Sequence, residues 1–288
     1  MKPAIFDYRR AESFEQACLL LAEKPEDSKI LAGGQTLIPM LNFRLARPKI
    51  LVDITRIPDR NHIAEQEGGI RIRATTVQRA VERSSVVQSR FPLLHRAVQH
   101  VAHLQIRNKG TIGGSIANGD PAAELPAMSV VFEAELEVRS SQGQRTTHAK
   151  DFFLGHYLTA LKPEEVLTSI YFPEPPKGTG WGFHELTRRA GDFALAGSAA
   201  LITVDQAGVC TRARITLFGA ASTPVRAQNA EGMLVGQQYS EALVAETAKA
   251  AKEVADPDSD VHASAEYRRT VVEVMAARAI RDAFKQKR

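Results

Sequence analysis

The chain has 288 residues, which is long for one hydrophobic core and favours two domains over one. Hydrophobic residues make up 44% and charged residues 24% of it, which excludes a largely disordered chain. The formal net charge is only +4, and few aromatic residues stand among the basic ones, so a nucleic-acid-binding protein is not expected.

The first elements in chain order follow from periodicity and capping. A helix is expected over residues 14–24, because Ser13 and Gln16 have the spacing of a capping box and Pro25 ends the pattern. Residues 28–34 read as a strand running into a glycine turn, and residues 51–55 as a second strand.

The middle of the chain alternates between the hydrophobic periodicity of helices and that of strands. A strand is expected over residues 68–78, after a turn at Gly68–Gly69. Helices are expected over 75–88 and 91–103. Residues 126–140 begin with a helical pattern and continue as a strand over 133–139, and a further strand is expected over 164–173.

The segment "PEPPKGTG" at 173–180 holds three prolines and two glycines and is predicted to be a linker. Three strands (181–189, 197–205 and 210–220) and two helices (240–255 and 266–287) are expected after it. Strands followed by helices indicate a second, α+β domain.

Neither cysteine belongs to a C-x-x-C pair, so this chain alone is not expected to hold a zinc or iron–sulfur site. Cys18 lies in the apolar pattern of the first helix and is predicted to be a buried thiol. The start of the sequence has no apolar core of a signal peptide, and no segment approaches the roughly 20 apolar residues of a membrane span. We therefore expect a cytoplasmic protein.

Two glycine pairs carry the functional signal. "LAGGQTLIP" spans Leu31 to Pro39, and "TIGGSIANGDPAAELPA" spans Thr111 to Ala127. A Gly-Gly turn lets backbone amides face an anion without an intervening Cβ, and each segment is expected to offer several consecutive N–H groups and a hydroxyl. Neither is a Rossmann fingerprint or a P-loop. One pair alone is an ordinary tight turn, but two together could hold a pyrophosphate from both sides.

These two motifs, with "FDYRRAESFEQA", "EEVLTSIYFP", "RRAGDFALA" and "SDVHASAEYRR", resemble the FAD-binding medium subunits of molybdenum hydroxylases, the xanthine dehydrogenase and carbon monoxide dehydrogenase family. The resemblance covers nearly the whole chain. It implies an α+β fold with a two-subdomain FAD-binding part of the vanillyl-alcohol oxidase-like type. That part would span residues 1–175, with subdomains of about 1–58 and 59–175. A C-terminal α+β domain with an antiparallel sheet and helices would follow over 181–288.

The resemblance also implies the cofactor residues. Around the pyrophosphate it places Leu31, Ala32, Gly33, Gly34, Gln35, Thr36 and Leu37 on one side, and Thr111, Ile112, Gly113, Gly114, Ser115 and Ala117 on the other. Glu124 is expected near the ribose and adenine, where the family often has Asp, and Val101 and Leu167 match apolar positions around the cofactor. Phe193, in "GDFA", is the expected stacking residue of the flavin; which of His184, Glu185 and Arg188 approaches the flavin stays open.

The implied function is electron transfer. Electrons from a molybdopterin subunit would pass through [2Fe–2S] clusters on a small subunit to FAD on this chain, and then to an external acceptor, within a dimer of heterotrimers. The flavin supplies the redox chemistry, so no catalytic side chain and no metal are expected here. The alternative is a self-sufficient FAD-dependent oxidoreductase of a small molecule, which would need its own acid/base group over the flavin.

Three other features are given structural roles. His95, His100 and His103 are close in sequence but lack the convergent ligands of a metal site, and are assigned to a partly solvated helix or a packing face. "DPDSD" at 256–260 lacks the glycine and the final glutamate of a calcium loop and is expected to lead to Ser264 as a helix N-cap. Trp181 is expected to anchor a domain interface.

Overall fold

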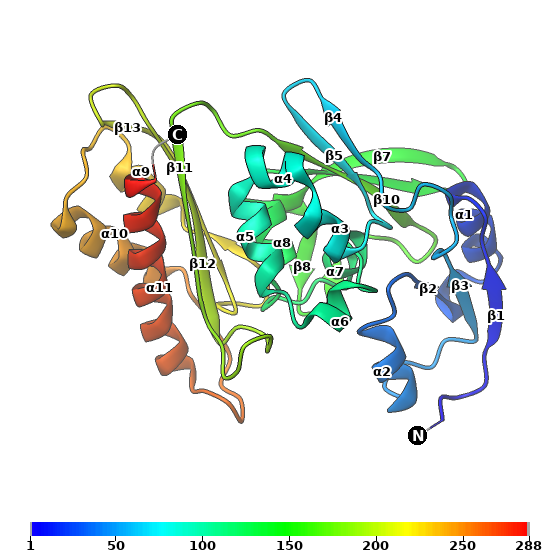
Figure 1. The fold of residues 1–288 in the computed structure, drawn as a ribbon. Coiled ribbons are helices and arrows are strands. Elements are labelled where there is room, and N and C mark those ends of the chain that lie inside the picture. Colours follow the sequence, from blue (N-terminus) through cyan, green and yellow to red (C-terminus); the bar gives the residue numbers. More distant parts are fainter. Residues whose placement is uncertain (1, 287–288) are drawn as a thin grey trace.

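The computed structural model describes residues 2–286, arranged around three sheets that follow one another along the molecule (Figure 1). The first sheet is parallel, in the order β1-β3-β2, and carries α1 and α2. Its strands and helices are β1 (Asp7–Arg10), α1 (Phe14–Glu23), β2 (Ser28–Leu31), α2 (Leu37–Asn42) and β3 (Ile50–Asp53).

The capping-box helix is confirmed as α1. The Ser13 hydroxyl accepts a hydrogen bond from the Gln16 amide at 3.1 Å. The Gln16 side chain reaches back to the amide of Glu12 at 2.6 Å, one residue before the N-cap. Cys18 is fully buried on this helix, as predicted, and its Sγ donates to the carbonyl of Arg139 at 3.4 Å, which joins α1 to the second sheet.

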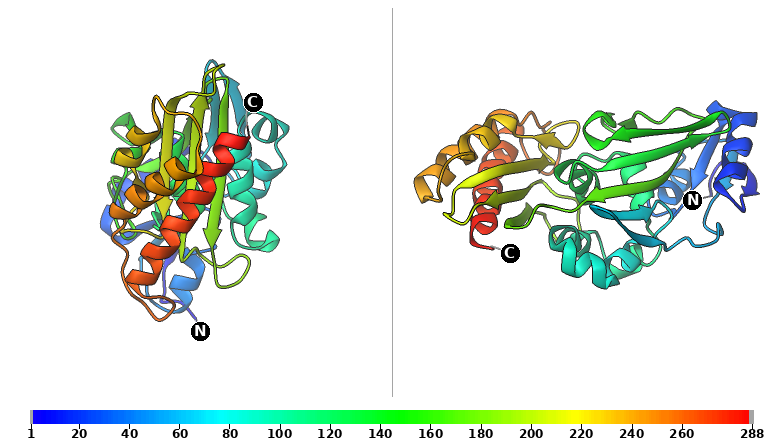
Figure 2. Two further views of the ribbon diagram at one scale, coloured as in Figure 1. Left: turned by 90° about the vertical axis from the view of Figure 1, so that its left-hand side faces the viewer. Right: turned by 90° about the horizontal axis from the view of Figure 1, so that it is seen from above.

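The second sheet is antiparallel, in the order β4-β5-β10-β6-β7, and its helices lie on one face (Figure 2). Its strands are β4 (Ile63–Gln66), β5 (Gly69–Arg73), β6 (Glu135–Ser140), β7 (Gly143–His148) and β10 (Val166–Pro173), with a separate hairpin of β8 (Phe153–Gly155) and β9 (Leu158–Thr159). Its helices are α3 (Gln78–Arg83), α4 (Ser85–Arg90), α5 (Pro92–His100), α6 (Leu104–Arg107), α7 (Ile112–Asn118) and α8 (Glu124–Val131).

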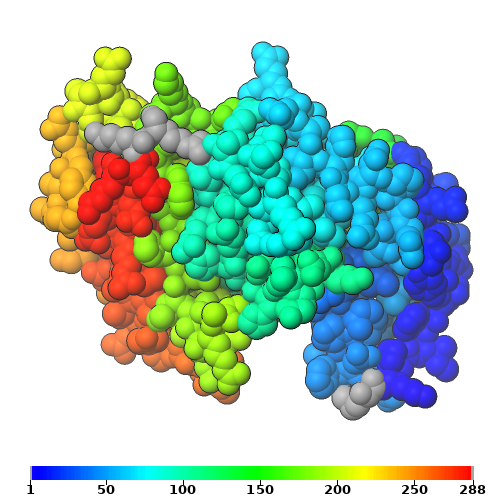
Figure 3. Space-filling view, in the orientation of Figure 1, coloured from blue at the N-terminus to red at the C-terminus, as the bar shows by residue number. Residues whose placement is uncertain are grey.

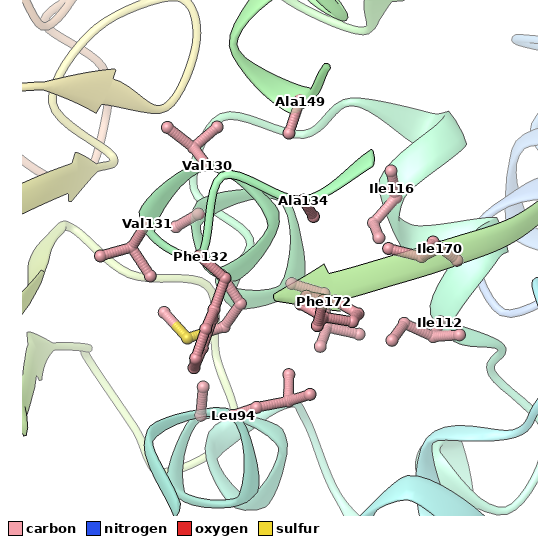
Figure 4. Close-up of a cluster of buried hydrophobic side chains, with 14 of the residues drawn as sticks. Leu94, Ile112, Ile116, Val130, Val131, Phe132, Ala134, Ala149, Ile170 and Phe172 are labelled. Carbon is pink, nitrogen blue, oxygen red and sulfur yellow. The ribbon is translucent and has the colours of Figure 1, made fainter. Parts of the chain in front are cut away.

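The largest core lies between this sheet and its helices (Figure 4). Phe132, at the end of α8, meets Phe172 of β10 edge to face, with ring centroids 5.8 Å apart. Leu94 of α5 and Ile112 of α7 are also fully buried in this core. Helix α8 is buried on every side, which explains why its sequence is mostly apolar rather than amphipathic, apart from the buried Glu124 and Ser129.

The third sheet is antiparallel, in the order β11-β12-β13-β14. It comprises β11 (Thr179–Leu186), β12 (Ala196–Val204), β13 (Cys210–Phe218) and β14 (Val225–Arg226), followed by α9 (Gln228–Leu234), α10 (Glu241–Glu253) and α11 (Ala265–Lys285). Ser264 caps α11 as predicted, and residue 287 of the expected last helix lies outside the described residues. None of the helices within residues 2–286 is long and apolar enough to cross a membrane.

Successive residues of β11 face α11 and the core of the second sheet in turn. Gly180 and Gly182 face α11 so closely that a Cβ atom on them would lie 1.9 Å from the Ala283 carbonyl oxygen and 2.0 Å from that of Ala279. Trp181 and Phe183 point the other way and pack into the core of the second sheet. The Trp181 position agrees with the interface role expected for it, and Glu185 continues the same face by the period of two.

An ion-pair cluster joins the end of α8 to the third sheet. Glu133 accepts hydrogen bonds from Arg212 at 2.9 Å, from Arg226 at 3.2 Å and from Arg214, whose side chain is only 7% exposed. Burial lowers the pKa of Arg214 to about 10, although the Glu133 charge opposes that shift. The carboxylate therefore compensates a buried cation.

We expect Glu133→Gln to lower the free energy of unfolding by roughly 2–3 kcal/mol, below the usual cost of breaking a buried pair because Glu133 is itself half exposed. Urea unfolding measures the effect. The control is Glu241→Gln, which removes an exposed carboxylate from its pair with Arg281 and should change stability little. Equal small changes in both variants would show that Arg214 does not depend on Glu133.

Candidate functional site

The first glycine segment follows β2. Residues 32–36 form an irregular loop into α2, and Gly34 adopts a positive φ of 71°. The Gln35 side chain donates to the Gly33 carbonyl at 3.0 Å and braces the loop. Within residues 2–286, no hydrogen bond uses the amides of residues 33–36 as donors. These consecutive N–H groups are therefore open to an anion.

The second glycine segment is a helix rather than a turn, which corrects the sequence interpretation. Thr111 is the N-cap of α7, and its hydroxyl accepts from the Gly114 amide at 3.0 Å. The amides of Ile112 and Gly113 bond to the carbonyls of Thr76 and Ala74, both at 2.9 Å, and that of Ser115 bonds to Thr111. The expectation that this segment offers several free N–H groups is wrong, because neighbouring backbone already accepts from them.

The glycines of both segments instead permit close approach. A Cβ atom on Gly33 would lie 2.4 Å from the Lys109 carbonyl oxygen and 2.6 Å from the Cα of Gly110. A Cβ on Gly113 would lie 2.3 Å from that of Ala74, and one on Gly114 would be 3.8 Å from that of Ala32. The two segments, 80 residues apart in sequence, therefore touch.

A small pocket, partly open to solvent, lies where they meet. It is lined by Ala32, Ile54, Thr55, Arg60, Thr75, Val77, Lys109 and Thr111. Arg60 and Lys109 place positive charge beside the glycine segments, and sequence reasoning did not select either. Lys109 could have been found from its position two residues before Thr111, whereas nothing in the sequence around Arg60 points to this place. A second hollow lies near Trp181 and contains none of the predicted cofactor residues.

The surface is hollowed between α2 and the loop that joins β11 to β12 (Figure 3). The remaining predicted residues lie on elements around the two glycine segments. Leu31 and Leu37 flank the first segment and are half-buried, as are Ala117 on α7 and Val101 at the end of α5. Leu167 is buried in the core of the second sheet, Glu124 is buried at the start of α8, and Phe193 is 57% exposed in the β11–β12 loop.

The β11–β12 loop contacts the second sheet's helices through Gly191. This glycine has a φ of 87°, and a Cβ on it would lie 2.6 Å from Cε1 of His103. The contact fixes the approach of the loop that carries Phe193. His95, by contrast, bonds to Gln99 at 3.4 Å, and His100 bonds to Glu185, so the three histidines have separate partners.

Gly191→Ala is expected to displace this loop and lower FAD retention several-fold. The matched control is Gly236→Ala, because Gly236 has a similar φ of 82° but no atom within 4 Å of an added Cβ. Both variants carry the same backbone strain of about 1 kcal/mol, so only the steric conflict with His103 differs. The flavin-to-protein absorbance ratio measures the outcome, and equal ratios in both variants would contradict the expectation.

The three residues left open by the sequence point in different directions. His184 bonds to Asp282 of α11 through Nε2 at 2.8 Å, and Arg188 bonds to Nδ1 of His262 at 2.7 Å. Glu185 alone faces the helices of the second sheet: its Oε1 is 2.8 Å from Nδ1 of His100 on α5. Of the three, Glu185 is therefore the one on the side of Val101 and Glu124.

Burial raises the pKa of two carboxyl groups near α8. Glu124 is 4% exposed, and burial together with the charge of Glu185 raises its pKa to about 8, whereas its own amide opposes the shift. Burial also raises the pKa of Asp120, although the Ala122 amide and the Tyr157 hydroxyl, at 2.9 and 3.3 Å, favour its charged form. Neither site resembles an acid/base pair over an open pocket.

Comparison with known proteins decides the family. Residues 4–175 match the FAD binding domain in molybdopterin dehydrogenase, and residues 181–283 match the CO dehydrogenase flavoprotein C-terminal domain. The chain belongs to the FAD-binding medium subunits of molybdenum hydroxylases. It is thus the FAD subunit of a molybdopterin-dependent oxidoreductase, and the family and the mixed α/β fold implied by the sequence resemblance are confirmed.

Three relatives illustrate the similarity. The chain is 41% identical over its full length, and over 97% of the other protein, to the 6-hydroxypseudooxynicotine dehydrogenase complex subunit alpha of Paenarthrobacter nicotinovorans. Its fold matches a chain of carbon monoxide dehydrogenase from Hydrogenophaga pseudoflava with a TM-score of 0.97, 38% identity and full coverage of both chains. It matches a chain of quinoline 2-oxidoreductase from Pseudomonas putida 86 with a TM-score of 0.94, 36% identity and 99% coverage of both.

The residues of this chain fit FAD. Open amides at residues 33–36 and the nearby Lys109 and Arg60 suit the negative charge of a diphosphate. Gly33 and Gly114 keep side chains away from the place where the two segments meet. When bound, the flavin supplies the redox chemistry, and the protein sets its position and surroundings.

Proposed function

We infer that this chain relays electrons within a heteromeric molybdenum hydroxylase. Electrons released by substrate oxidation on a molybdopterin subunit would pass through [2Fe–2S] clusters on a small subunit to FAD on this chain, and from there to an external acceptor. The observation that carries this inference is the pairing of two glycine segments, one with open amides, in a chain that belongs to the family of FAD-binding medium subunits.

We assign FAD binding to residues 1–175, with subdomains of about 1–58 and 59–175 that each contribute one glycine segment. The linker predicted over 173–180 is shorter, because Pro173 ends β10 and Thr179 begins β11, so only residues 174–178 join the two strands. Residues 181–288 would form the C-terminal domain that brings the β11–β12 loop to the flavin. The diphosphate would be held by the amides of Gly33 to Thr36 and the wall at Thr111 to Ser115, and Phe193 would stack on the flavin. Ala117, Val101 and Leu167 would surround the cofactor, and Glu124 would lie near its ribose and adenine.

The partners follow from the same assignment. We propose a dimer of heterotrimers in the cytoplasm, each trimer holding this chain, a small [2Fe–2S] subunit and a large molybdopterin subunit. Among the relatives, one is named a subunit of a 6-hydroxypseudooxynicotine dehydrogenase complex, and others are named for carbon monoxide, nicotine and caffeine. The substrate class is therefore a small molecule such as an N-heteroaromatic compound, an aldehyde, a purine or carbon monoxide.

The test is purification of the native complex. We expect a yellow protein with molybdenum and iron, whose flavin absorbance bleaches when one substrate of a panel of those compounds is added. The isolated chain should stay yellow and unbleached by the same substrate, because substrate oxidation would occur on the large subunit. A folded chain without affinity for FAD would refute the proposal, and bleaching of the isolated chain would favour the self-sufficient oxidoreductase.

A further inference from the structure

A tight turn joins α5 to α6 and supports the loop that carries Phe193. This α5–α6 turn consists of Val101, Ala102 and His103, and Val101 is one of the predicted cofactor residues. Gly191 of the β11–β12 loop lies directly on the turn. A Cβ atom on Gly191 would be 2.6 Å from Cε1 of His103 and 3.1 Å from the carbonyl carbon of Ala102. The place of Phe193, two residues further on, therefore depends on the shape of the α5–α6 turn.

The α5–α6 turn is strained at its centre. Ala102 has a φ of 42°, in the left-handed region that residues with a Cβ atom rarely adopt. Such a conformation persists only where the surrounding structure holds it. His103 is the N-cap of α6, but within residues 2–286 its side chain makes no capping hydrogen bond to that helix. The turn is therefore held by a group outside it.

Arg107, the last residue of α6, is that group. Its Nη1 donates to the carbonyl oxygens of Val101 at 2.9 Å and of Ala102 at 3.0 Å. This nitrogen carries two protons, one for each carbonyl. No other donor within residues 2–286 bonds to either oxygen. The two carbonyls belong to the peptide groups on either side of the Ala102 Cα, so one guanidinium group fixes the orientation of both.

A buried carboxylate in turn orients the guanidinium group. Nε of Arg107 donates to Oε2 of Glu82 on α3 at 3.0 Å, and the two side chains are only 12% and 11% exposed. Arg79, one turn earlier on α3, pairs with the other oxygen of Glu82 at 2.8 Å. Because the donors of a guanidinium group point in fixed directions, the bond from Nε to Glu82 aims Nη1 at the α5–α6 turn. Helix α3 thus supports the turn through Arg107.

We propose that Arg107 is a positioning residue of the flavin site, which holds the α5–α6 turn in the shape on which the loop with Phe193 rests. It acts through Val101 and Gly191 rather than on the flavin itself. The part of this proposal that concerns the flavin rests on the proposed function. The part that concerns the loop can be tested without FAD.

The first test is hydrogen exchange of the purified full-length chain without FAD, followed by mass spectrometry. Arg107→Met removes the donors and keeps an unbranched side chain in the buried position. We expect the peptide over residues 187–195 to exchange several-fold faster in this variant, because the loop loses its support. Two amides of this segment, those of Asp192 and Leu195, make backbone hydrogen bonds in the wild-type chain and report the change.

The matched control is Arg79→Met. Each variant removes one of the two arginines of Glu82 and leaves the other, but within the described residues only Arg107 bonds to the α5–α6 turn. Exchange over 187–195 should therefore stay at the wild-type rate in Arg79→Met. Equal acceleration in both variants would refute the proposal, because the loss would then come from Glu82. So would an unchanged rate in a folded Arg107→Met chain.

Arg107→Lys is the second variant, and it decides the matter if circular dichroism shows that Arg107→Met does not fold. Lysine keeps a cation beside Glu82, but its single nitrogen cannot serve the carboxylate and both carbonyls in the same geometry. We expect faster exchange over 187–195 here too, by a smaller factor. Wild-type exchange in Arg107→Lys would refute the forked contact.

The second test uses the chain loaded with FAD and measures the quenching of flavin fluorescence by iodide. In Arg107→Met we expect iodide to quench the bound flavin several-fold more strongly, because the loop with Phe193 no longer covers it, whereas Arg79→Met should match wild type. Faster loop exchange with unchanged quenching would refute the link to the flavin. A wild-type chain that binds no FAD would refute the proposed function, and the exchange rates would still decide whether Arg107 positions the loop.

Discussion

Gly33→Val is expected to lower the affinity for FAD by at least about tenfold. The added Cβ would lie 2.4 Å from the Lys109 carbonyl oxygen, so the first glycine loop and the segment before α7 must separate. Overpacking of this kind costs about 1–3 kcal/mol, and each 1.4 kcal/mol lost from binding is a factor of ten. The change would also misplace the open amides of the loop. The flavin-to-protein ratio of the purified chain and titration with FAD measure the loss.

The matched control is Gly232→Val on α9, where an added Cβ meets nothing within 4 Å. Both variants replace a glycine without a left-handed φ by the same side chain, and within a helix valine is tolerated at least as well as glycine. Circular dichroism separates loss of cofactor from loss of fold. A folded Gly33→Val chain that binds FAD as tightly as Gly232→Val would show that the close approach of the two segments is not needed for the cofactor.

Local chemistry made much of the fold predictable. The cap at Ser13 and the stop at Pro25 define α1, and the alternating run before Pro173 defines β10. The strands β11, β12 and β13 were predicted because each is eight or nine residues long, whereas β14 has only two residues and was missed. In contrast, β1 reads as charged and polar, and it is a strand only because β3 lies beside it with a parallel register.

The adjacency of the two glycine segments was predictable from the sequence, but the hydrogen bonding of their amides was not. Glycine pairs signal close backbone approach, and both segments indeed adjoin one another. Two glycines disfavour a helix, yet α7 forms because Gly113 packs on Ala74 and the carbonyls of Ala74 and Thr76 accept its first amides. Those partners are about 40 residues away. The bond between His100 and Glu185 joins residues separated by 85 positions, and no local pattern encodes it.

Glu124→Gln is expected to stabilise the flavin-free chain at alkaline pH. The pKa of Glu124 is raised to about 8 in the folded chain, by burial and by the charge of Glu185, and returns to its ordinary value of about 4.3 on unfolding. Between these values the folded chain binds a proton that the unfolded chain does not. The free energy of unfolding therefore falls by about 1.4 kcal/mol per pH unit across this window, on the order of 5 kcal/mol in all.

Glutamine cannot ionise, so the variant escapes this fall, and its advantage over wild type should grow from about pH 5 to pH 8 and then level off. Glu82→Gln should instead lower the free energy of unfolding at neutral pH, and this loss should shrink as the pH falls. Burial would raise the pKa of Glu82, but Arg79 and Arg107 hold it below its ordinary value, so its contribution is present at neutral pH and is lost as the pH falls through the folded pKa. Urea unfolding at several pH values distinguishes the two. Parallel curves for wild type and Glu124→Gln would mean that Glu124 is ionised in the folded chain.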